Sequence, residues 1–128
     1  MVILQTQGVE IKVRTAFSNE QSSPAHSRYF FLYEITILNK NEFAIQLLRR
    51  KWFICDSTGE QHEVEGDGVI GMQPVLTPNE KFTYNSGCPL QSEMGKMSGF
   101  YTMLRLFDSK EFIARVPEFH FIVPGKLN

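Results

Sequence analysis

The chain has 128 residues, of which 42% are hydrophobic and 21% charged, and its formal net charge is −1. This length and composition predict a single globular domain over residues 1–128, with its core at about residues 9–123. The charge argues against duplex nucleic acid as a partner, because proteins that bind it usually carry a basic excess. The sequence has no apolar run of about 20 residues, which argues against a membrane partner.

The first part of the chain predicts long β-strands. Apolar residues alternate with charged residues from Val9 to Phe17, which is typical of a half-buried strand. Residues 18–24 are polar and end in proline, so a loop is expected there. Arg28 to Leu38 is rich in aromatic and β-branched residues and predicts a central strand, followed by a turn at residues 39–42.

The segment from Phe43 to Asp56 predicts a strand with an irregularity. Its apolar residues change parity near Arg49-Arg50-Lys51, as a β-bulge requires. Trp52 follows directly, and a tryptophan on a central strand of a sandwich commonly fills the space between the sheets. We therefore expect Trp52 to be buried and to meet Tyr101 and Phe100 from the opposite sheet.

The rest of the chain predicts shorter strands separated by turns. The expected strands are 61–65, 81–86, 97–107, 111–116 and 119–123, with a loop from Gly87 to Gly95. No segment predicts an α-helix, and the expected total is seven or eight strands. This pattern is typical of an all-β fold, either an antiparallel β-sandwich or a barrel.

Three glycines match G-x-G-x-x-G, the fingerprint of a dinucleotide-binding turn: Gly66, Gly68 and Gly71. That fingerprint requires a helix after its last glycine, and Pro74 and Pro78 make a helix unfavourable here. We therefore expect an extended chain after Gly71 and no dinucleotide-binding fold. The simplest interpretation is that the glycines supply positive φ angles or allow two backbones to approach closely.

An alternative interpretation gives the same turn a ligand. Backbone N–H groups between Gly66 and Gly71 would form a concave nest for the oxygens of a phosphate or nucleotide. Arg49, Arg50 and Lys51 would then supply the counter-charge. Nearby carboxylates oppose an anion, and the three basic residues also fit a solvated rim.

Acidic residues beside the glycines offer a metal hypothesis. Glu63, Glu65 and Asp67 fall on one face of their strand and His62 on the other. Carboxylates are the ligands that Mg²⁺ prefers, but same-face neighbours on a strand lie about 7 Å apart, too far to share one ion without a bend at Gly66. A solvated acidic edge, which discourages aggregation between sheet edges, is the favoured interpretation.

The sequence contains no catalytic motif. His26, His62 and His120 occur in none of the usual metal-binding or nucleophile patterns, so we expect a protein that is not an enzyme and needs no cofactor. Cys55 and Cys88 are the only cysteines, which predicts reduced thiols and a cytoplasmic location. Cys55 in particular is expected to be a small buried hydrophobic residue.

Three stretches resemble the ApaG family, in the family's order: RRKWFICDSTGEQHEVEG, GDGVIGMQPVLTPNEKFTYNSGCPL and GKMSGFYTM. The resemblance runs from about Val9 to Phe121. Asn79 departs from the family pattern, which has glycine there, but asparagine also tolerates the left-handed conformation. The resemblance implies an immunoglobulin- or fibronectin-III-like sandwich and the bacterial stand-alone form.

The resemblance also implies a functional class. Family members are linked to cobalt resistance and magnesium efflux, and similar domains in eukaryotic F-box and polymerase-interacting proteins look like protein-recognition modules. The chain contains 11 Phe, 4 Tyr and 1 Trp, more than one small core needs, and the surplus fits a contact surface. We therefore favour a module for an unknown protein partner, as a monomer or weak homodimer, over the phosphate or nucleotide alternative.

Overall fold

A computed structural model describes residues 1–125 of the chain, which contain nine strands, one 3₁₀ turn and no α-helix. The strands are β1 (Val2–Thr6), β2 (Val9–Ser23), β3 (Arg28–Asn39), β4 (Ile45–Asp56), β5 (Gln61–Asp67), β6 (Val75–Leu76), β7 (Lys81–Leu90), β8 (Met94–Arg105) and β9 (Lys110–Ile122), and the 3₁₀ turn η1 covers Pro24–His26.

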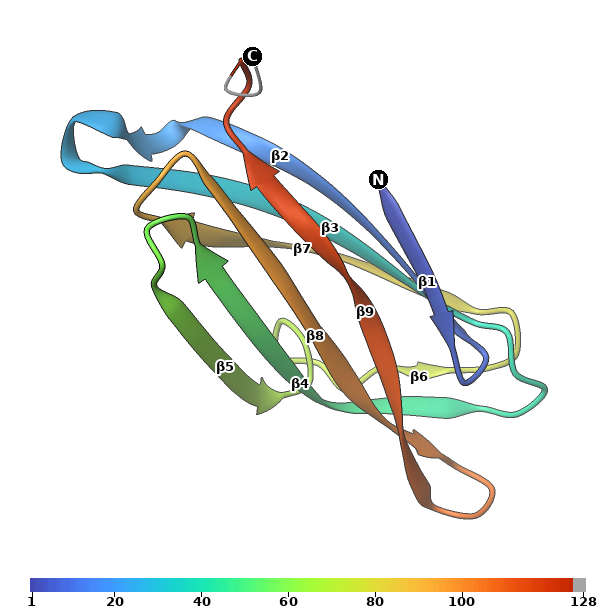
Figure 1. The fold of residues 1–128 in the computed structure, drawn as a ribbon. Helices are drawn as coiled ribbons and strands as arrows, with labels where there is room; N and C mark the ends of the chain where they lie inside the picture. The colour runs from blue at the N-terminus through green and yellow to red at the C-terminus, as the bar shows by residue number, and fades with distance from the viewer. Residues whose placement is uncertain (126–128) are drawn as a thin grey trace.

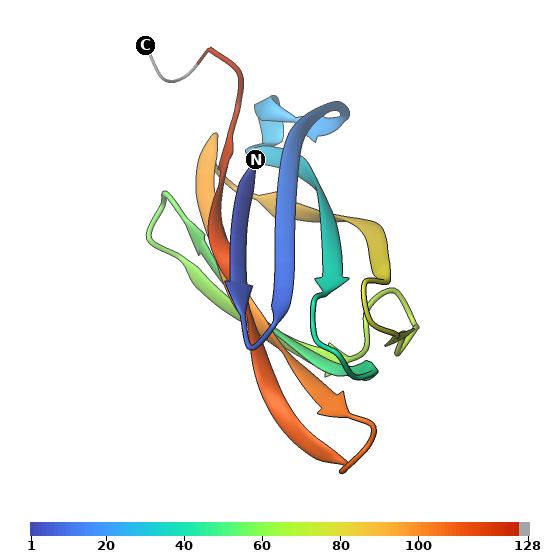
Figure 2. The same cartoon turned by 90° about the vertical axis from the view of Figure 1, so that its right-hand side faces the viewer.

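The strands form two antiparallel sheets that face each other, so the predicted β-sandwich is confirmed (Figure 1). One sheet has the order β1-β2-β3-β7, and the other has the order β5-β4-β8-β9, with β6 added to β4. Figure 2 shows the molecule from its side, with β1 and β2 nearest the viewer and the hairpin between β8 and β9 extending beyond the body.

Alternation along the strands builds the core. Val9, Ile11 and Val13 of β2 are buried, as their period-two spacing predicts, and Ile35 and Ile37 of β3 lie beside them on the same sheet. Because each strand presents every second side chain to the other sheet, the inner faces close on one another and exclude water.

Aromatic rings occupy the centre of the sandwich around Trp52, which is buried as predicted. Its ring lies 6.0 Å from Tyr33 of the opposite sheet, 5.9 Å from Tyr101 and 6.1 Å from Phe119. The prediction that Tyr101 and Phe100 come from the opposite sheet is wrong, because β8 pairs directly with β4. Phe100 pairs with Lys51 in that ladder and contacts Phe53 instead of Trp52.

Several strands run further than the sequence predicts. β7 continues through Cys88 to Leu90 where a loop was expected, and β9 is one strand where two were expected. Pro89 is tolerated because β7 is the end strand of its sheet, where a missing N–H breaks no ladder on the open side. β2 continues to Ser23 through an irregular pairing with β3 in place of the expected loop.

Two short strands were not predicted. β1 pairs with β2 through a tight turn at Gln7 and Gly8, whose φ angles of 50° and 74° are those of a type I′ hairpin. Gln-Gly is a weaker signal for this turn than Asn-Gly, so the hairpin was not predicted from the residues. β6 has only the two residues Val75 and Leu76, which is too short for periodicity to detect.

The sandwich is closed on one side and open on the other. β9 packs beside β1 and β2, where the backbone N–H of Arg115 donates a hydrogen bond of 2.8 Å to Thr6 Oγ1. On the other side the sheets end in β5 and β7, which pair with one neighbour each and not with each other. Charged and aromatic side chains gather on this open side and on the outer face of β4.

Candidate functional site: the outer face of β4 and β8

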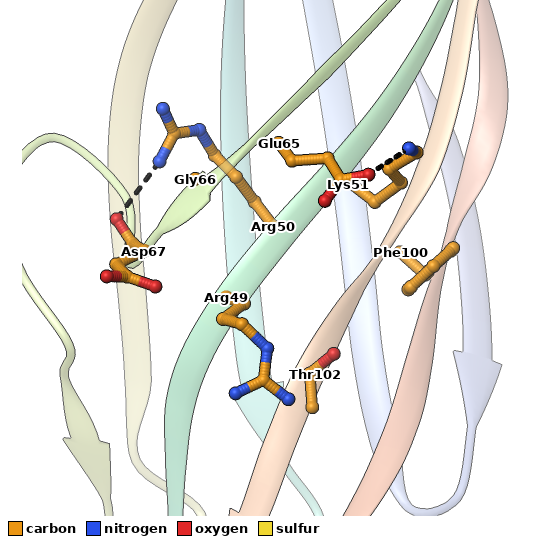
Figure 3. Close-up of a pocket in the computed structure, with 8 residues that line it drawn as sticks. All are labelled: Arg49, Arg50, Lys51, Glu65, Gly66, Asp67, Phe100 and Thr102. Carbon is orange, nitrogen blue, oxygen red and sulfur yellow. Dashed lines mark hydrogen bonds and ion pairs between the residues drawn. The ribbon is translucent and has the colours of Figure 1, made fainter.

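A hollow of about 360 Å³ lies on the outer face of the β5-β4-β8-β9 sheet (Figure 3). It lies beside the glycine turn and is lined by residues from β4, β5 and β8. These are Arg49, Arg50, Lys51, Glu65, Gly66, Asp67, Phe100 and Thr102. The structure therefore brings the predicted basic cluster, the first glycine and two of the predicted acids to one place.

A bulge in β4 decides which residues face outward. Pairing with β8 shifts between Leu47 and Arg49, close to the parity change predicted from the sequence. Beyond the shift, Arg49, Lys51 and Phe53 lie on the outer face, and the residues between them turn toward the opposite sheet. Without this one-residue insertion the side chains of Arg49 and Lys51 would enter the core, because side chains alternate along a strand.

Ion pairs neutralise most of the charge on this face. Arg49 Nη2 lies 2.7 Å from Glu111 Oε1 of β9, and Lys51 Nζ lies 2.8 Å from Glu63 Oε1 and also contacts Glu65. Hydrogen bonds to Glu63 and Glu65 raise the pKa of Lys51, and the Lys51 hydrogen bond lowers the pKa of Glu65. Both groups therefore stay charged at neutral pH.

The acidic row does not converge as a metal site would require. Glu63 and Glu65 share the ammonium group of Lys51, whereas the carboxylate of Asp67 points away from Glu65 in Figure 3. Among residues 1–125 no group of three or more His, Cys, Asp and Glu side chains is placed to hold a metal ion. The metal hypothesis for Glu63, Glu65 and Asp67 gains no support from this geometry.

The glycine turn presents carbonyl groups to an arginine. Arg50 Nη1 donates hydrogen bonds of 3.0 Å to the carbonyl oxygens of Asp67 and Gly68. The N–H of Gly68 donates to Leu48 O at 2.8 Å, and the N–H of Val69 donates to Met72 O at 2.8 Å. These amides are therefore already bonded within the chain. The turn is better suited to bind a cation, through its carbonyl oxygens, than to bind an anion.

The local structure explains why each position of the motif is a glycine. A Cβ on Gly66 would lie 2.7 Å from Arg50 Nη1, so this glycine makes room for the guanidinium group across β5. Gly68 has a φ of 61° and a Cβ there would lie 2.1 Å from Met72 O, and Gly71 has a φ of 76°. After Gly71 the chain contains only the short strand β6 before Asn79, whose φ of 68° is the predicted left-handed conformation.

An aromatic pair lies next to the charged groups. The rings of Phe53 and Phe100 are 6.3 Å apart, and Lys51 Nζ lies 5.6 Å from the centre of the Phe53 ring. Phe53 is 41% exposed although it is a large apolar side chain. Phe53 belongs to no functional motif in the sequence, but its position next to Trp52 on a strand placed it on the opposite face.

None of the thiols and histidines of residues 1–125 lines the hollow of Figure 3. Cys88 is buried in β7, and burial raises the pKa of its thiol to about 11; both cysteines are free. Cys55 was predicted to be buried but is only half-buried at the end of β4. His120 is exposed between the buried Phe119 and Phe121, as its alternation predicts.

No helix within residues 1–125 has the length and apolar character needed to cross a membrane.

Comparison with known proteins identifies the family. The model of the ApaG domain matches residues 19–105 of this chain. Protein ApaG of Anaeromyxobacter dehalogenans (strain 2CP-1) is 45% identical over 123 residues, which are 96% of this chain and 96% of the relative. Protein ApaG of Methylobacterium sp. (strain 4-46) is 46% identical over 120 residues, which are 94% of this chain and 92% of the relative.

Solved structures agree with these relatives. The crystal structure of an ApaA protein from Bordetella pertussis superposes on this chain with a TM-score of 0.88 at 35% identity, covering 91% of this chain and 94% of that one. The family model spans most of the sequence, and the relatives align along nearly all of it. This chain therefore belongs to the ApaG family.

Proposed function

We propose that this protein is a cytoplasmic, non-enzymatic module that recognises another protein through the outer face of the β5-β4-β8-β9 sheet. The observation that carries the proposal is the aromatic pair of the exposed Phe53 and the half-buried Phe100 at the centre of that face. Aromatic side chains surrounded by polar residues are the usual composition of a protein interface and of its energetic hot spots.

The surroundings of the pair fit a polar rim. Lys51 lies over Phe53, and the pairs Arg49–Glu111 and Lys96–Glu118 lie further out on the same face. A second hollow of about 510 Å³ on the other side of Phe53 is lined partly by Lys96 and Glu118. Charges of both signs at the edge of an aromatic centre favour a specific, complementary partner surface.

The electrostatics of this face support recognition over catalysis. A general acid or base works best when its pKa is shifted toward neutrality. The pKa of Lys51 is raised and that of Glu65 is lowered, so both shifts move away from neutrality and keep the two groups ionised. The free cysteines support the cytoplasmic part of the proposal, because thiols stay reduced in that compartment.

The phosphate or nucleotide alternative has less support at the turn itself. The amides of Gly68 and Val69 are used within the chain, and the basic residues Arg49 and Lys51 are already paired with carboxylates. The turn would have to lose these bonds before it could cradle a phosphate group, which is a cost that a preformed nest avoids.

Quantitative affinity capture tests the proposal. Wild-type protein and the double variant Phe53→Ala/Phe100→Ala are used as baits, with Phe107→Ala as the matched control because Phe107 is 70% exposed at the tip of the β8–β9 hairpin. We expect at least one protein to be enriched by the wild type and by Phe107→Ala and lost with the double variant. Loss of a hot-spot pair should weaken the purified complex by at least about 2 kcal/mol, roughly thirtyfold in Kd.

Two results would contradict the proposal. One is a partner that the double variant retains and Phe107→Ala loses, which would place the surface at the hairpin tip. The other is a wild-type bait that enriches nothing beyond what an unrelated β-sandwich enriches. Thermal unfolding of all three baits shows that each is folded before capture.

A further inference from the structure

A small cavity opens between the two sheets on the open side of the sandwich. It has a volume of about 200 Å³ and is lined by Arg50 and Trp52 from β4, Tyr33 from β3, and Tyr84 and Ser86 from β7, with residues 69–70 of the glycine turn. Arg50 therefore borders the outer hollow of Figure 3 and this inner cavity as well. The proposed recognition surface does not require such a cavity.

The cavity concentrates hydroxyl groups in an apolar setting. Tyr33 and Ser86 are direct partners in the β3–β7 ladder, and the hydroxyl groups of Tyr84 and Tyr101 lie 2.5 Å apart. Burial raises the pKa of Tyr33 and of Tyr84, so both hydroxyls keep their protons at physiological pH. The walls therefore place neutral hydroxyl groups, which can donate or accept hydrogen bonds, in the same cavity as Arg50.

The charge of Arg50 is not balanced by a carboxylate. Arg50 takes part in none of the ion pairs that occur among residues 1–125, in contrast to its neighbours Arg49 and Lys51. Among contacts within the described part of the chain, Nη1 alone donates hydrogen bonds, to the carbonyl oxygens of Asp67 and Gly68, and these bonds with the space above Gly66 fix the guanidinium group in place. Its other N–H donors remain for a ligand.

From this geometry we propose that the cavity binds a single carboxylate group, held by Arg50 and by the hydroxyls of Tyr33, Tyr84 and Ser86. The volume of about 200 Å³ is below the roughly 300–1,000 Å³ of pockets that enclose whole organic ligands, so a nucleotide does not fit. A planar carboxylate matches the two-pronged donor geometry of a guanidinium group.

One unbalanced positive charge selects a monovalent anion over a dianion. Phosphate near neutral pH carries more negative charge than Arg50 can balance. The adjacent strand β5 also carries the carboxylates of Glu63, Glu65 and Asp67, of which Lys51 pairs with the first two. These acids repel a dianion more strongly than a carboxylate. The carboxylate can belong to a free organic acid or to an acidic side chain or chain end of a peptide.

Intrinsic fluorescence provides a direct assay, because Trp52 is the only tryptophan in the chain and forms part of the cavity wall. The wild-type protein is titrated with acetate, with inorganic phosphate, and with a short acetylated peptide that ends in a free carboxylate or in an amide, all at constant ionic strength. We expect a saturable change in Trp52 emission with acetate and with the free-acid peptide, at lower concentration than with phosphate, and none with the amide.

Matched variants assign the signal to the cavity. Arg50→Gln should weaken carboxylate binding at least tenfold, and Ser86→Ala, at the rim of the cavity, should weaken it by a smaller factor. Arg49→Gln, the adjacent arginine on the opposite face of β4, should leave binding unchanged. Should Arg50→Gln fail to fold, Arg50→Lys keeps the charge without the guanidinium fork and should still weaken binding.

The possible results separate clearly. A response to acetate equal to that of the peptide indicates a free organic acid as ligand, and a much stronger response to the peptide indicates a partner's carboxylate; both support the site. Absence of saturation with acetate and peptide, preference for phosphate, or equal losses in Arg50→Gln and Arg49→Gln would each overturn it. Because Phe53 and Phe100 are untouched, none of these outcomes decides the proposed protein-recognition surface.

Discussion

At the scale of single residues, neighbours on β4 have opposite roles. Trp52 is 3% exposed between the sheets, whereas Phe53 faces outward beside Phe100. The strand's alternation separates a core residue from a surface residue by one position. The sequence was sufficient to predict the burial of Trp52, because a tryptophan on a central strand of a sandwich commonly fills the space between the sheets.

Replacing Trp52 should therefore destabilise the fold far more than replacing Phe53. We expect Trp52→Ala to lower the free energy of unfolding by about 3–5 kcal/mol, because it leaves a cavity among Tyr33, Tyr101 and Phe119. Phe53→Ala should cost less than about 1 kcal/mol. Urea titration measures both, and comparable losses would show that Phe53 also belongs to the core.

The glycine motif shows the limit of residue-level prediction. Its sequence suggested either backbone freedom or an anion nest, and the deciding feature is the side chain of Arg50, which lies over Gly66 and donates hydrogen bonds to two carbonyl oxygens. That contact joins residues on two different strands. No spacing within Gly66–Gly71 contains this information, so both interpretations stayed open until the strands were placed.

At the scale of elements, the end of β4 is tied to the β7–β8 loop by a buried carboxylate. Asp56 accepts hydrogen bonds from the N–H of Gln91 at 2.7 Å and of Thr58 at 3.4 Å, and from the hydroxyl of Ser92. Burial alone would raise the pKa of Asp56, but these hydrogen bonds outweigh it and the pKa is lowered from 3.8.

This shift predicts a specific dependence of stability on pH. Because the folded pKa is depressed, the stabilisation by Asp56 is fully present above its unfolded value near 3.8 and is lost as pH falls through the lower folded value. Asp56→Asn should be less stable than wild type at neutral pH, and the gap should narrow below about pH 4. Urea unfolding at a series of pH values measures the gap; a constant gap would contradict the assignment.

Element boundaries were predicted where local signals agree with tertiary pairing, and not elsewhere. The extents of β3 and β4 follow from their aromatic and β-branched composition. β7 continues through Gly87 and Pro89 because neither residue disrupts the strand. The ring of Phe30 from β3 fills the space at Gly87, and Pro89 lies on the end strand of its sheet, where proline is tolerated. The contact comes from a residue far away in sequence, so the glycine and proline alone wrongly predicted a loop from Gly87.

At the scale of the whole molecule, strand count and spacing predicted an all-β sandwich or barrel and the family resemblance implied the sandwich, whereas the surfaces required the sheet order. The outer face that carries Phe53 and Phe100 exists because β4 and β8 are neighbours, and the carboxylate cavity exists because β5 and β7 end their sheets unpaired with each other. Strand order depends on long-range packing and not on local pattern. The sequence therefore predicted a sandwich and a recognition role without locating either site.

The proposed recognition surface is tested most directly by hydroxyl-radical footprinting of the protein alone and with its purified partner. In the free protein Phe53 should be oxidised, because it is 41% exposed, and Phe107 should be oxidised more readily because it is 70% exposed. We predict that the partner protects Phe53 and Phe100 and leaves the oxidation of Phe107 unchanged. Unchanged oxidation of Phe53 and Phe100 in a saturated complex would contradict the account.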